Sequence, residues 1–381
     1  MTSRAEGAAE QRHAAGSGGP VDDGTGRRRA QVVGTGLIGG SLGLALRRRG
    51  WHVTGSDLNG DRAEQALARG VVDELGDDPE AQVVFVAIPA AGVPLVAGEL
   101  LADPSRNPDA VVTDVSGVKE AVVDAVGHPR FVGGHPMAGS EQIGLEGADP
   151  DLFVGATWVL TPTTQTDLGA YSRLQAVLGE LGAEIVALTP ADHDRLVAVV
   201  SHVPHLVAAT LMNAAAAGAE HDAALLRLAA GGFRDMTRVA AGHPGIWPDI
   251  CADNADAIVS TLDRLMADLQ VMRTRVAEGD RRGLLESLSL ASTARRSLPA
   301  RAARPDDLAE LRMPVPDREG VLAEITSLAG NLGINIYDIE IAHSSEGAHG
   351  VLVLVVEARE AAELHDAVTG LGYRCTTQEL A

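Results

Sequence analysis

Three glycines follow the apolar stretch Ala30–Val33 and stand just before a helix-length segment: Gly34, Gly36 and Gly39. In this arrangement the first glycine permits a tight turn, the second lets backbone N–H groups approach a pyrophosphate, and the third lets the helix pack closely on the strand. The N-terminus of the helix then favours the anion. The predicted contacts with a dinucleotide cofactor are Gly34, Gly36, Leu37, Ile38 and Gly39.

A carboxylate, Asp57, follows the next apolar stretch, Val53–Gly55. At this place a carboxylate accepts hydrogen bonds from a ribose diol and repels a 2′-phosphate, which favours NAD over NADP. Arg62, one helical turn further on, weakens that preference. A structural alternative stays open, in which the glycines only form a turn and Asp57 only caps the next helix.

His135 lies in the segment Gly133–Glu141, which reads GGHPMAGSE and follows the apolar stretch Phe131–Gly133. We expect a glycine-rich loop at the carboxyl end of a strand, where ligands of open α/β sheets bind. A neutral imidazole there could take the proton of a hydroxyl while the carbon that bears it loses a hydride. From the chemistry alone, catalysis and a structural role remain equally open for His135.

Two further motifs place imidazoles and cations in the second half of the chain. Ser201–His205 reads SHVPH, and Gly232–Ala240 reads GFRDMTRVA. Their structural alternatives are a helix kink with capping histidines and an exposed ion pair between Asp235 and an arginine of the same motif.

These motifs, together with Ala191–Asp194 (ADHD), resemble the prephenate dehydrogenase family, which includes arogenate dehydrogenases. The resemblance covers residues 30 to about 298. It implies that His135 is the catalytic histidine and that His205 and Arg238 bind the substrate, with Arg238 pairing a carboxylate in the bidentate geometry of a guanidinium. It also implies that Asp235 holds Arg238 or His205 in place, whereas His193 and Asp194 are expected to be structural.

The chain departs from the family pattern at one place. The family usually reads Asp-Xaa-Xaa-Ser-Val-Lys, and its serine contacts both the substrate and the catalytic histidine. Here Asp114–Lys119 reads DVSGVK, so that Gly117 stands where the serine is expected and Ser116 comes one residue early. Ser116 remains the catalytic candidate, with a helix-capping role as its alternative.

The resemblance implies oxidation of the C4 hydroxyl of prephenate by NAD with loss of the ring carboxylate as CO2, which gives 4-hydroxyphenylpyruvate in tyrosine biosynthesis. Arogenate shares the same ring and stays open as the substrate. A non-catalytic amino-acid sensor is the alternative from another class. If His135 is the base, kcat/KM is predicted to fall in acid with an apparent pKa near that of an imidazole.

The residue pattern divides the chain into domains. Over residues 29–189, β-rich stretches alternate with helix-length segments, which predicts an α/β Rossmann-type NAD-binding domain with a parallel sheet. Residues 190–298 are predicted to be all-helical and to form the substrate and dimerisation domain. The segment Leu206–Ala217 is apolar on more than one face, so we expect a homodimer.

A polar linker, residues 299–307, precedes a third domain over residues 308–381 with a predicted βαββαβ order. This part resembles an ACT domain, a small ferredoxin-like α+β module. The resemblance implies tyrosine feedback through Asp317, Gly320 and Asn335. Glu319 replaces the family's proline in this turn, and a purely dimerising role stays open.

Composition excludes several function classes. The net charge of −21 repels phosphate backbones, so nucleic acid is not an expected partner. Two cysteines, Cys251 and Cys375, are too few for a disulfide framework or a thiolate metal site, and we expect no metal and a cytoplasmic location. The apolar runs are broken, so no membrane segment is expected, and residues 1–28 are predicted to be a disordered tail.

Overall fold

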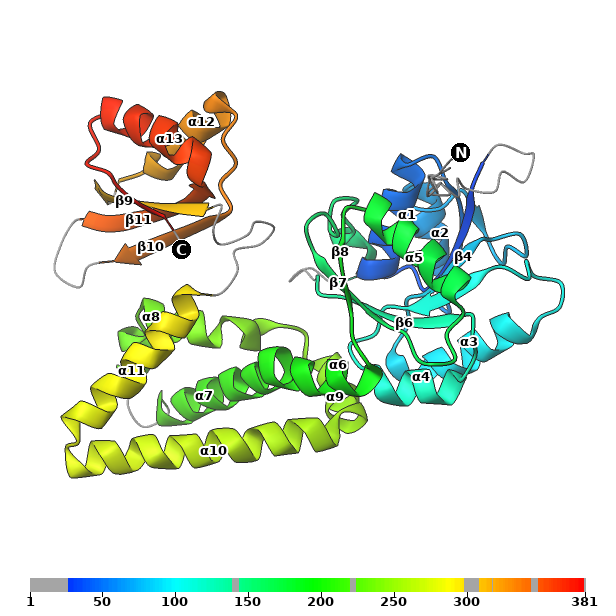
Figure 1. Ribbon diagram of the computed structural model, residues 1–381, viewed down its shortest axis with the longest axis horizontal. Coiled ribbons are helices and arrows are strands. Elements are labelled where there is room, and N and C mark those ends of the chain that lie inside the picture. Colours follow the sequence, from blue (N-terminus) through cyan, green and yellow to red (C-terminus); the bar gives the residue numbers. More distant parts are fainter. Residues whose placement is uncertain are drawn as a thin grey trace, which may run out of the picture.

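The computed structural model describes residues 27–138, 144–219, 224–297, 308–316, 318–343 and 349–379. They form a sheet domain, a helical region and a small C-terminal unit (Figure 1). Most of the predicted tail and all of the linker 299–307 lie outside the described residues. Arg27 and Arg28 belong to the fold rather than to a tail, because Arg27 donates to Gly50 O and Arg28 pairs with Glu180.

Eight strands among the described residues form the main sheet, in the order β3-β2-β1-β4-β5-β6-β7-β8. Their bounds are β1 Arg29–Val33, β2 His52–Ser56, β3 Glu74–Leu75, β4 Val83–Val86, β5 Val111–Asp114, β6 Phe131–Pro136, β7 Thr157–Thr161 and β8 Glu184–Ala187. The predicted stretches Ala30–Val33, Val53–Gly55 and Phe131–Gly133 are present as β1, β2 and β6. The sequence analysis missed β3, which has only two residues, and β8, which is largely exposed and so lacks the apolar run of a buried strand.

The prediction of a wholly parallel sheet was wrong, because β7 runs antiparallel to β6. This pairing also lengthens β6 beyond its predicted end: His135 faces Val159 and Pro136 faces Trp158 in the ladder. His135 therefore lies on a strand and not in a loop, and the ladder to β7 holds its backbone.

Helices cover both faces of the sheet. Helices α1 (Leu37–Arg48) and α5 (Leu168–Glu180) contribute to one apolar core, and α3 (Val93–Ala102) and α4 (Glu120–Val126) to the other. Strand β4 shows the two-residue period that this requires, since Val83 and Phe85 join the first core and Val84 and Val86 the second. Helix α2 (Gly60–Ala68) adds Ala66 to the first core.

The region after Pro190 is all-helical, as predicted. Its helices are α6 Pro190–Val197, α7 Val203–Ala219, α8 Gly231–Thr237, α9 Trp247–Asp253, α10 Ala255–Glu278 and α11 Arg281–Arg296. A π-helical turn, Ala198–His202, joins α6 to α7. The turn lies directly before Pro204, whose missing N–H breaks the regular helical hydrogen bonding.

The continuous helix Pro190–Ala219 is, of the residues described, the one helix long and apolar enough to cross a bilayer by length and composition. No membrane segment was expected from the sequence, because its longest apolar runs are broken by proline or polar residues. The helix buries His193, Asp194 and His202. Apolar helices at the core or the subunit contacts of globular proteins pass the same test.

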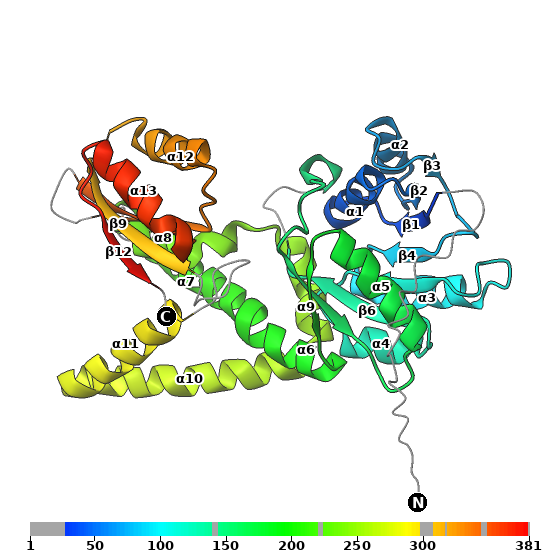
Figure 2. The same cartoon turned by 45° about the horizontal axis from the view of Figure 1, so that its top comes forward.

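The C-terminal unit has the predicted βαββαβ order. Its elements are β9 Leu308–Pro316, α12 Val321–Leu332, β10 Asp338–His343, β11 His349–Glu357, α13 Ala358–Gly370 and β12 Thr376–Glu379. The sheet is antiparallel with the order β10-β11-β9-β12, and both helices lie on one face of it (Figure 2). Its core joins Leu311 and Leu354 to Ile325 and Leu364 of the helices.

Candidate active site

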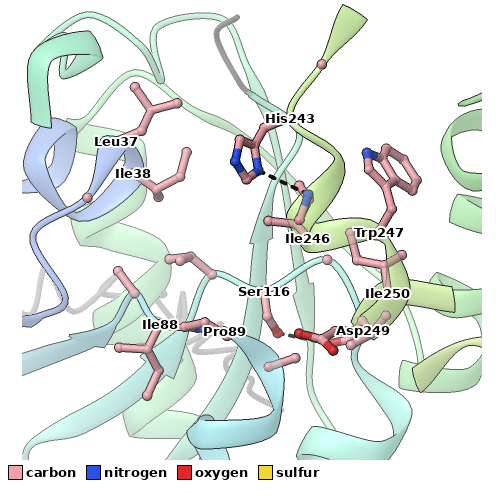
Figure 3. Close-up of a pocket in the computed structure, with 18 of the residues that line it drawn as sticks. Leu37, Ile38, Ile88, Pro89, Ser116, His243, Ile246, Trp247, Asp249 and Ile250 are labelled. Carbon is pink, nitrogen blue, oxygen red and sulfur yellow. Dashed lines mark hydrogen bonds between the residues drawn. The ribbon is translucent and has the colours of Figure 1, made fainter. Parts of the chain in front are cut away.

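A cavity of about 840 Å³ opens beyond the carboxyl ends of β1, β4 and β5 and is closed on its far side by the helical region (Figure 3). The sheet side contributes Gly36–Ile38, Ala87–Ala90 and Val115–Val118. The helical side contributes His205, Arg238 and residues of α9 and the turn before it. A cavity between two domains at the switch point of an open α/β sheet is the usual place for a cofactor and its substrate.

The three glycines of the turn after β1 have different structural roles. Gly34 has a φ of +92°, and a Cβ on Gly39 would lie 1.8 Å from Gly34 O, so the fold itself requires both residues. A Cβ on Gly36 would meet nothing within 4 Å. Gly36, Leu37 and Ile38 line the cavity.

Asp57, directly after β2, holds this turn. Its carboxylate accepts hydrogen bonds from Thr35 N and Asn59 N, both at 2.9 Å, and Arg62 lies 3.3 Å away. Although burial acts to raise its pKa, the N–H groups of Asn59 and Thr35 together with Arg62 keep the pKa of Asp57 below its ordinary value. Asp57 is therefore an ionised acceptor at the end of β2.

His135 is joined to helix α6 by two hydrogen bonds in series. Its Nδ1 lies 2.8 Å from His193 Nε2, and His193 Nδ1 lies 2.7 Å from Asp194 Oδ1. The carboxylate of Asp194 also accepts from the backbone N–H groups of Lys119 and Glu120, each at 2.8 Å. The sequence analysis expected His193 and Asp194 to be structural and did not connect them to His135.

The other ring nitrogen of His135 lies at the edge of the cavity. A Cβ on Gly117, which lines the cavity, would be 3.9 Å from both Cε1 and Nε2 of His135. Burial lowers the pKa of His135 well below its ordinary value, and His193, Lys119 and His202 lower it further. His135 is therefore neutral near pH 7, as a base must be.

Ser116 lines the cavity, but its hydroxyl belongs to a buried network. It bonds to the carboxylate of Asp114 and to Val118 O at 3.1 Å, and it accepts from Lys119 Nζ at 2.9 Å. Lys119 pairs with Asp114 in turn, and burial lowers the pKa of Lys119 while Asp114 opposes this. The partners of the Ser116 hydroxyl are thus Asp114, Val118 and Lys119, whereas Gly117 is the residue that lies beside His135 Nε2.

His205 and Arg238 line the same cavity from the helical side. The ring of His205 stacks on Trp247 with 3.6 Å between the centroids and 14° between the planes, and burial lowers the pKa of His205. Asp235, in contrast, is exposed on α8 and does not belong to the cavity lining. The structure thus brings His205 and Arg238, but not Asp235, to the side opposite the glycine turn.

Two family models match the chain. One, described as the nucleotide-binding domain of prephenate dehydrogenase, matches residues 42–187, and the other, its dimerization domain, matches residues 189–290. The chain belongs to the prephenate dehydrogenase family. Prephenate dehydrogenase of Bacillus subtilis is 36% identical to it over 84% of this chain and 90% of that protein.

Relatives named for other activities are also similar. The cyclohexadienyl dehydrogenase of Zymomonas mobilis is 32% identical over 70% of this chain and 94% of its own length. The crystal structure of Synechocystis arogenate dehydrogenase matches with 36% identity and a TM-score of 0.62, over 71% of this chain and all of that one. Prephenate dehydrogenase from Aquifex aeolicus, solved with hydroxyphenyl propionate and NAD+, matches with 28% identity and a TM-score of 0.66, over 71% of this chain and 98% of that one.

Several residues of the cavity in this family member escaped the sequence analysis. Trp247, His243, Asp249 and Asp253 all line it. Burial, Asp249 and Asp194 raise the pKa of Asp253. These four cavity residues follow Arg238 in the segment HPGIWPDICAD, where no spacing indicated a site. A tryptophan in a proline-rich turn close to a predicted substrate-binding arginine is a signal that could have been used.

The predicted effector residues are only partly described. Asp317 lies outside the described residues. Gly320 directly precedes α12 with a φ of +87°, which glycine adopts readily, and Asn335 is exposed in the loop before β10.

Proposed function

We propose that this member of the prephenate dehydrogenase family oxidises prephenate with NAD, with loss of the ring carboxylate as CO2, to give 4-hydroxyphenylpyruvate. The observation that carries the proposal is that a candidate base and candidate substrate-binding residues adjoin the same cavity. Gly117, beside His135 Nε2, lines its sheet side, and His205 and Arg238 line its helical side. A base and a guanidinium can therefore reach one small molecule.

The residues of the glycine turn fit a dinucleotide. The space at Gly36 allows the close approach of a pyrophosphate, and the first turn of α1 lines the cavity beside it. Asp57 is an ionised acceptor placed for the ribose hydroxyls. The cofactor is NAD, and when bound it supplies the acceptor for a hydride.

In this scheme His135 moves one proton. Its neutral Nε2 takes the proton of the C4 hydroxyl as C4 loses its hydride, which leaves a carbonyl at C4. The bond between the ring and its carboxylate then breaks, CO2 leaves, and the electron pair of that bond makes the ring aromatic. The oxygen recovers a proton as the phenol forms, so that His135 ends the cycle neutral.

Arg238 and His205 bind the substrate in the same scheme. The guanidinium of Arg238 pairs with a carboxylate in bidentate geometry, and His205 donates from a ring that Trp247 holds by stacking. These contacts align C4 with the nicotinamide and with His135, which is the main demand of a reaction that aromatisation drives.

A second candidate substrate is arogenate, which carries an ammonium group where prephenate carries a keto group. Two carboxylates of the cavity, Asp249 and Asp253, favour a cation at that end of the substrate. The names of the relatives include both activities.

The test is the formation of NADH by the full-length protein with NAD and either substrate. We expect turnover with prephenate, and in His135→Asn a loss of about 10² to 10⁴ in kcat with NAD affinity retained. Faster turnover with arogenate would favour the second candidate. Absence of NADH with both substrates would contradict the proposal.

We also infer that the protein is a homodimer through its helical region, that the C-terminal unit is an ACT domain that binds tyrosine, and that the location is cytoplasmic. Exposed apolar residues of α10 and α11 and the match to a dimerization domain support the first inference. The βαββαβ order supports the second. Addition of tyrosine to the assay tests it, with a lower rate expected.

A further inference from the structure

We propose that His193 and Asp194 are positioning residues that hold His135 in one tautomer, with the proton on Nδ1 and a free lone pair on Nε2. The catalytic meaning of this inference rests on the proposed function, but the tautomer itself does not. The three side chains come from β6 and α6, and 58 residues separate His135 from His193.

The direction of the hydrogen bonds follows from the carboxylate at the end of the series. Asp194 Oδ1 already accepts the N–H group of Lys119 and Oδ2 that of Glu120, so both of its oxygens are acceptors. The atom of His193 that faces it, Nδ1, must therefore carry a hydrogen. Because a neutral imidazole has one N–H, Nε2 of His193 is then an acceptor.

The direction of the hydrogen bond at His135 follows from the tautomer of His193. Its Nδ1 lies 2.8 Å from the accepting Nε2 of His193 and so must donate. The remaining nitrogen, Nε2, has no hydrogen in the neutral ring and lies next to Gly117 at the cavity. The series thus leaves the lone pair on the nitrogen that can reach a substrate.

The surroundings favour neutral rings at this place. Lys119, which directly precedes α4 and is paired with Asp114, lies near His135. His202, at the end of the π-helical turn, also lies near it. Asn254 Nδ2 donates to His202 Nδ1 at 3.2 Å and to Asp194 O at 2.8 Å, which makes His202 Nδ1 an acceptor as well. Burial lowers the pKa of His202 to about 4.

The arrangement also has a consequence for the protonated enzyme. When His135 takes up a proton, the resulting cation shares its Nδ1–H with His193, whose own N–H faces the carboxylate of Asp194. The negative charge of Asp194 therefore stabilises the imidazolium through His193. An isolated buried imidazole would lack this support.

The direct experiment is NMR of the full-length protein with 15N-labelled histidine at neutral pH, because the 15N shift of a ring nitrogen reports whether it carries a hydrogen. The His135 signals are identified by their loss in His135→Asn. We expect a protonated Nδ1 and an unprotonated Nε2 in His135. A protonated Nε2 with an unprotonated Nδ1 would overturn the proposal, whether or not the enzyme turns over prephenate.

A kinetic arm separates positioning from mere packing. His193→Leu removes the acceptor and should lower kcat at least about tenfold, with KM changed less than about threefold. His193→Gln supplies a carbonyl acceptor and should restore kcat to within about threefold of the wild type. His365→Gln, at a half-buried histidine bonded to Thr377 in the C-terminal unit, is the control and should change neither constant. Equal losses in folded His193→Gln and His193→Leu would contradict the role.

Discussion

Among single residues, His135 is the one on which the proposed chemistry depends most. Its surroundings change the pKa that the sequence predicted for it. Burial and the nearby Lys119, His193 and His202 lower its pKa well below that of an ordinary imidazole. Since the base is active when neutral, activity falls as pH falls through this pKa. We therefore predict that the acid limb of kcat/KM lies clearly below pH 6.5.

The pH–rate profile with saturating NAD checks this prediction. An acid limb centred at the ordinary imidazole value would mean that the free enzyme leaves His135 solvated. Substrate ionisation is controlled by measuring the pH profile of kcat as well, because kcat reports the enzyme–substrate complex and not the free substrate.

Arg238 should act on binding more than on chemistry. We predict that Arg238→Gln raises KM for the substrate about 10- to 100-fold, because a charge-assisted pair worth about 1.5–3 kcal/mol is lost. Arg234→Gln, an exposed arginine of the preceding helix α8 whose Nε donates to Ala229 O, is the control and should leave KM within about twofold. Steady-state kinetics decide, and an unchanged KM in Arg238→Gln would remove Arg238 from the site.

Ser116 should matter for stability. Its hydroxyl bonds to Asp114, Val118 O and Lys119 in a buried network, so Ser116→Ala should lower the free energy of unfolding by about 1–3 kcal/mol. Denaturant unfolding measures this. A variant of unchanged stability with a large loss of kcat would show that the hydroxyl serves catalysis instead.

Among the structural elements, the turn between β1 and α1 contains one glycine that the fold requires and another that is expected to affect only NAD binding. Gly39→Ala places a Cβ 1.8 Å from Gly34 O and should lower the free energy of unfolding by about 2 kcal/mol or more. Gly36→Ala meets no atom within 4 Å, so stability should hold while NAD affinity falls about tenfold, because its Cβ enters the space for the pyrophosphate. Thermal unfolding and NAD titration of both variants check this, and equal effects of the two on stability would contradict it.

Sequence patterns predicted the elements well where local rules apply. The strand, turn and helix around Gly34–Gly39 and the βαββαβ order of the C-terminal unit follow from residue periodicity and glycine chemistry. The antiparallel direction of β7 and the exposed strand β8 depend on tertiary packing, which no local window contains. For the same reason the contact of His135 with His193, between distant segments, could not be predicted.

At the scale of the whole molecule, the site exists because two domains meet. His205 and Arg238 were predictable from their motifs, whereas Trp247, Asp249 and Asp253 join the cavity only through the path of the chain after α8. The helical region leaves apolar side chains exposed in the single chain, and such a surface marks an interface.

We predict that Leu285→Asp on α11 shifts the protein from dimer to monomer, because this exposed leucine belongs to the apolar surface of the helical region. Leu95→Asp on α3 is matched in exposure, 68% against 67%, and should leave the dimer intact. Analytical ultracentrifugation at several concentrations distinguishes the two. A monomeric wild type, or a dimer that survives Leu285→Asp unchanged, would contradict this interface.

The most direct test of the central claim is a crystal structure of the protein with NAD and 4-hydroxyphenylpyruvate. We predict one product molecule in the cavity, with its phenol oxygen within hydrogen-bond distance of His135 Nε2 and its carboxylate bound by Arg238. A product bound so that these two residues cannot contact it together would contradict the account.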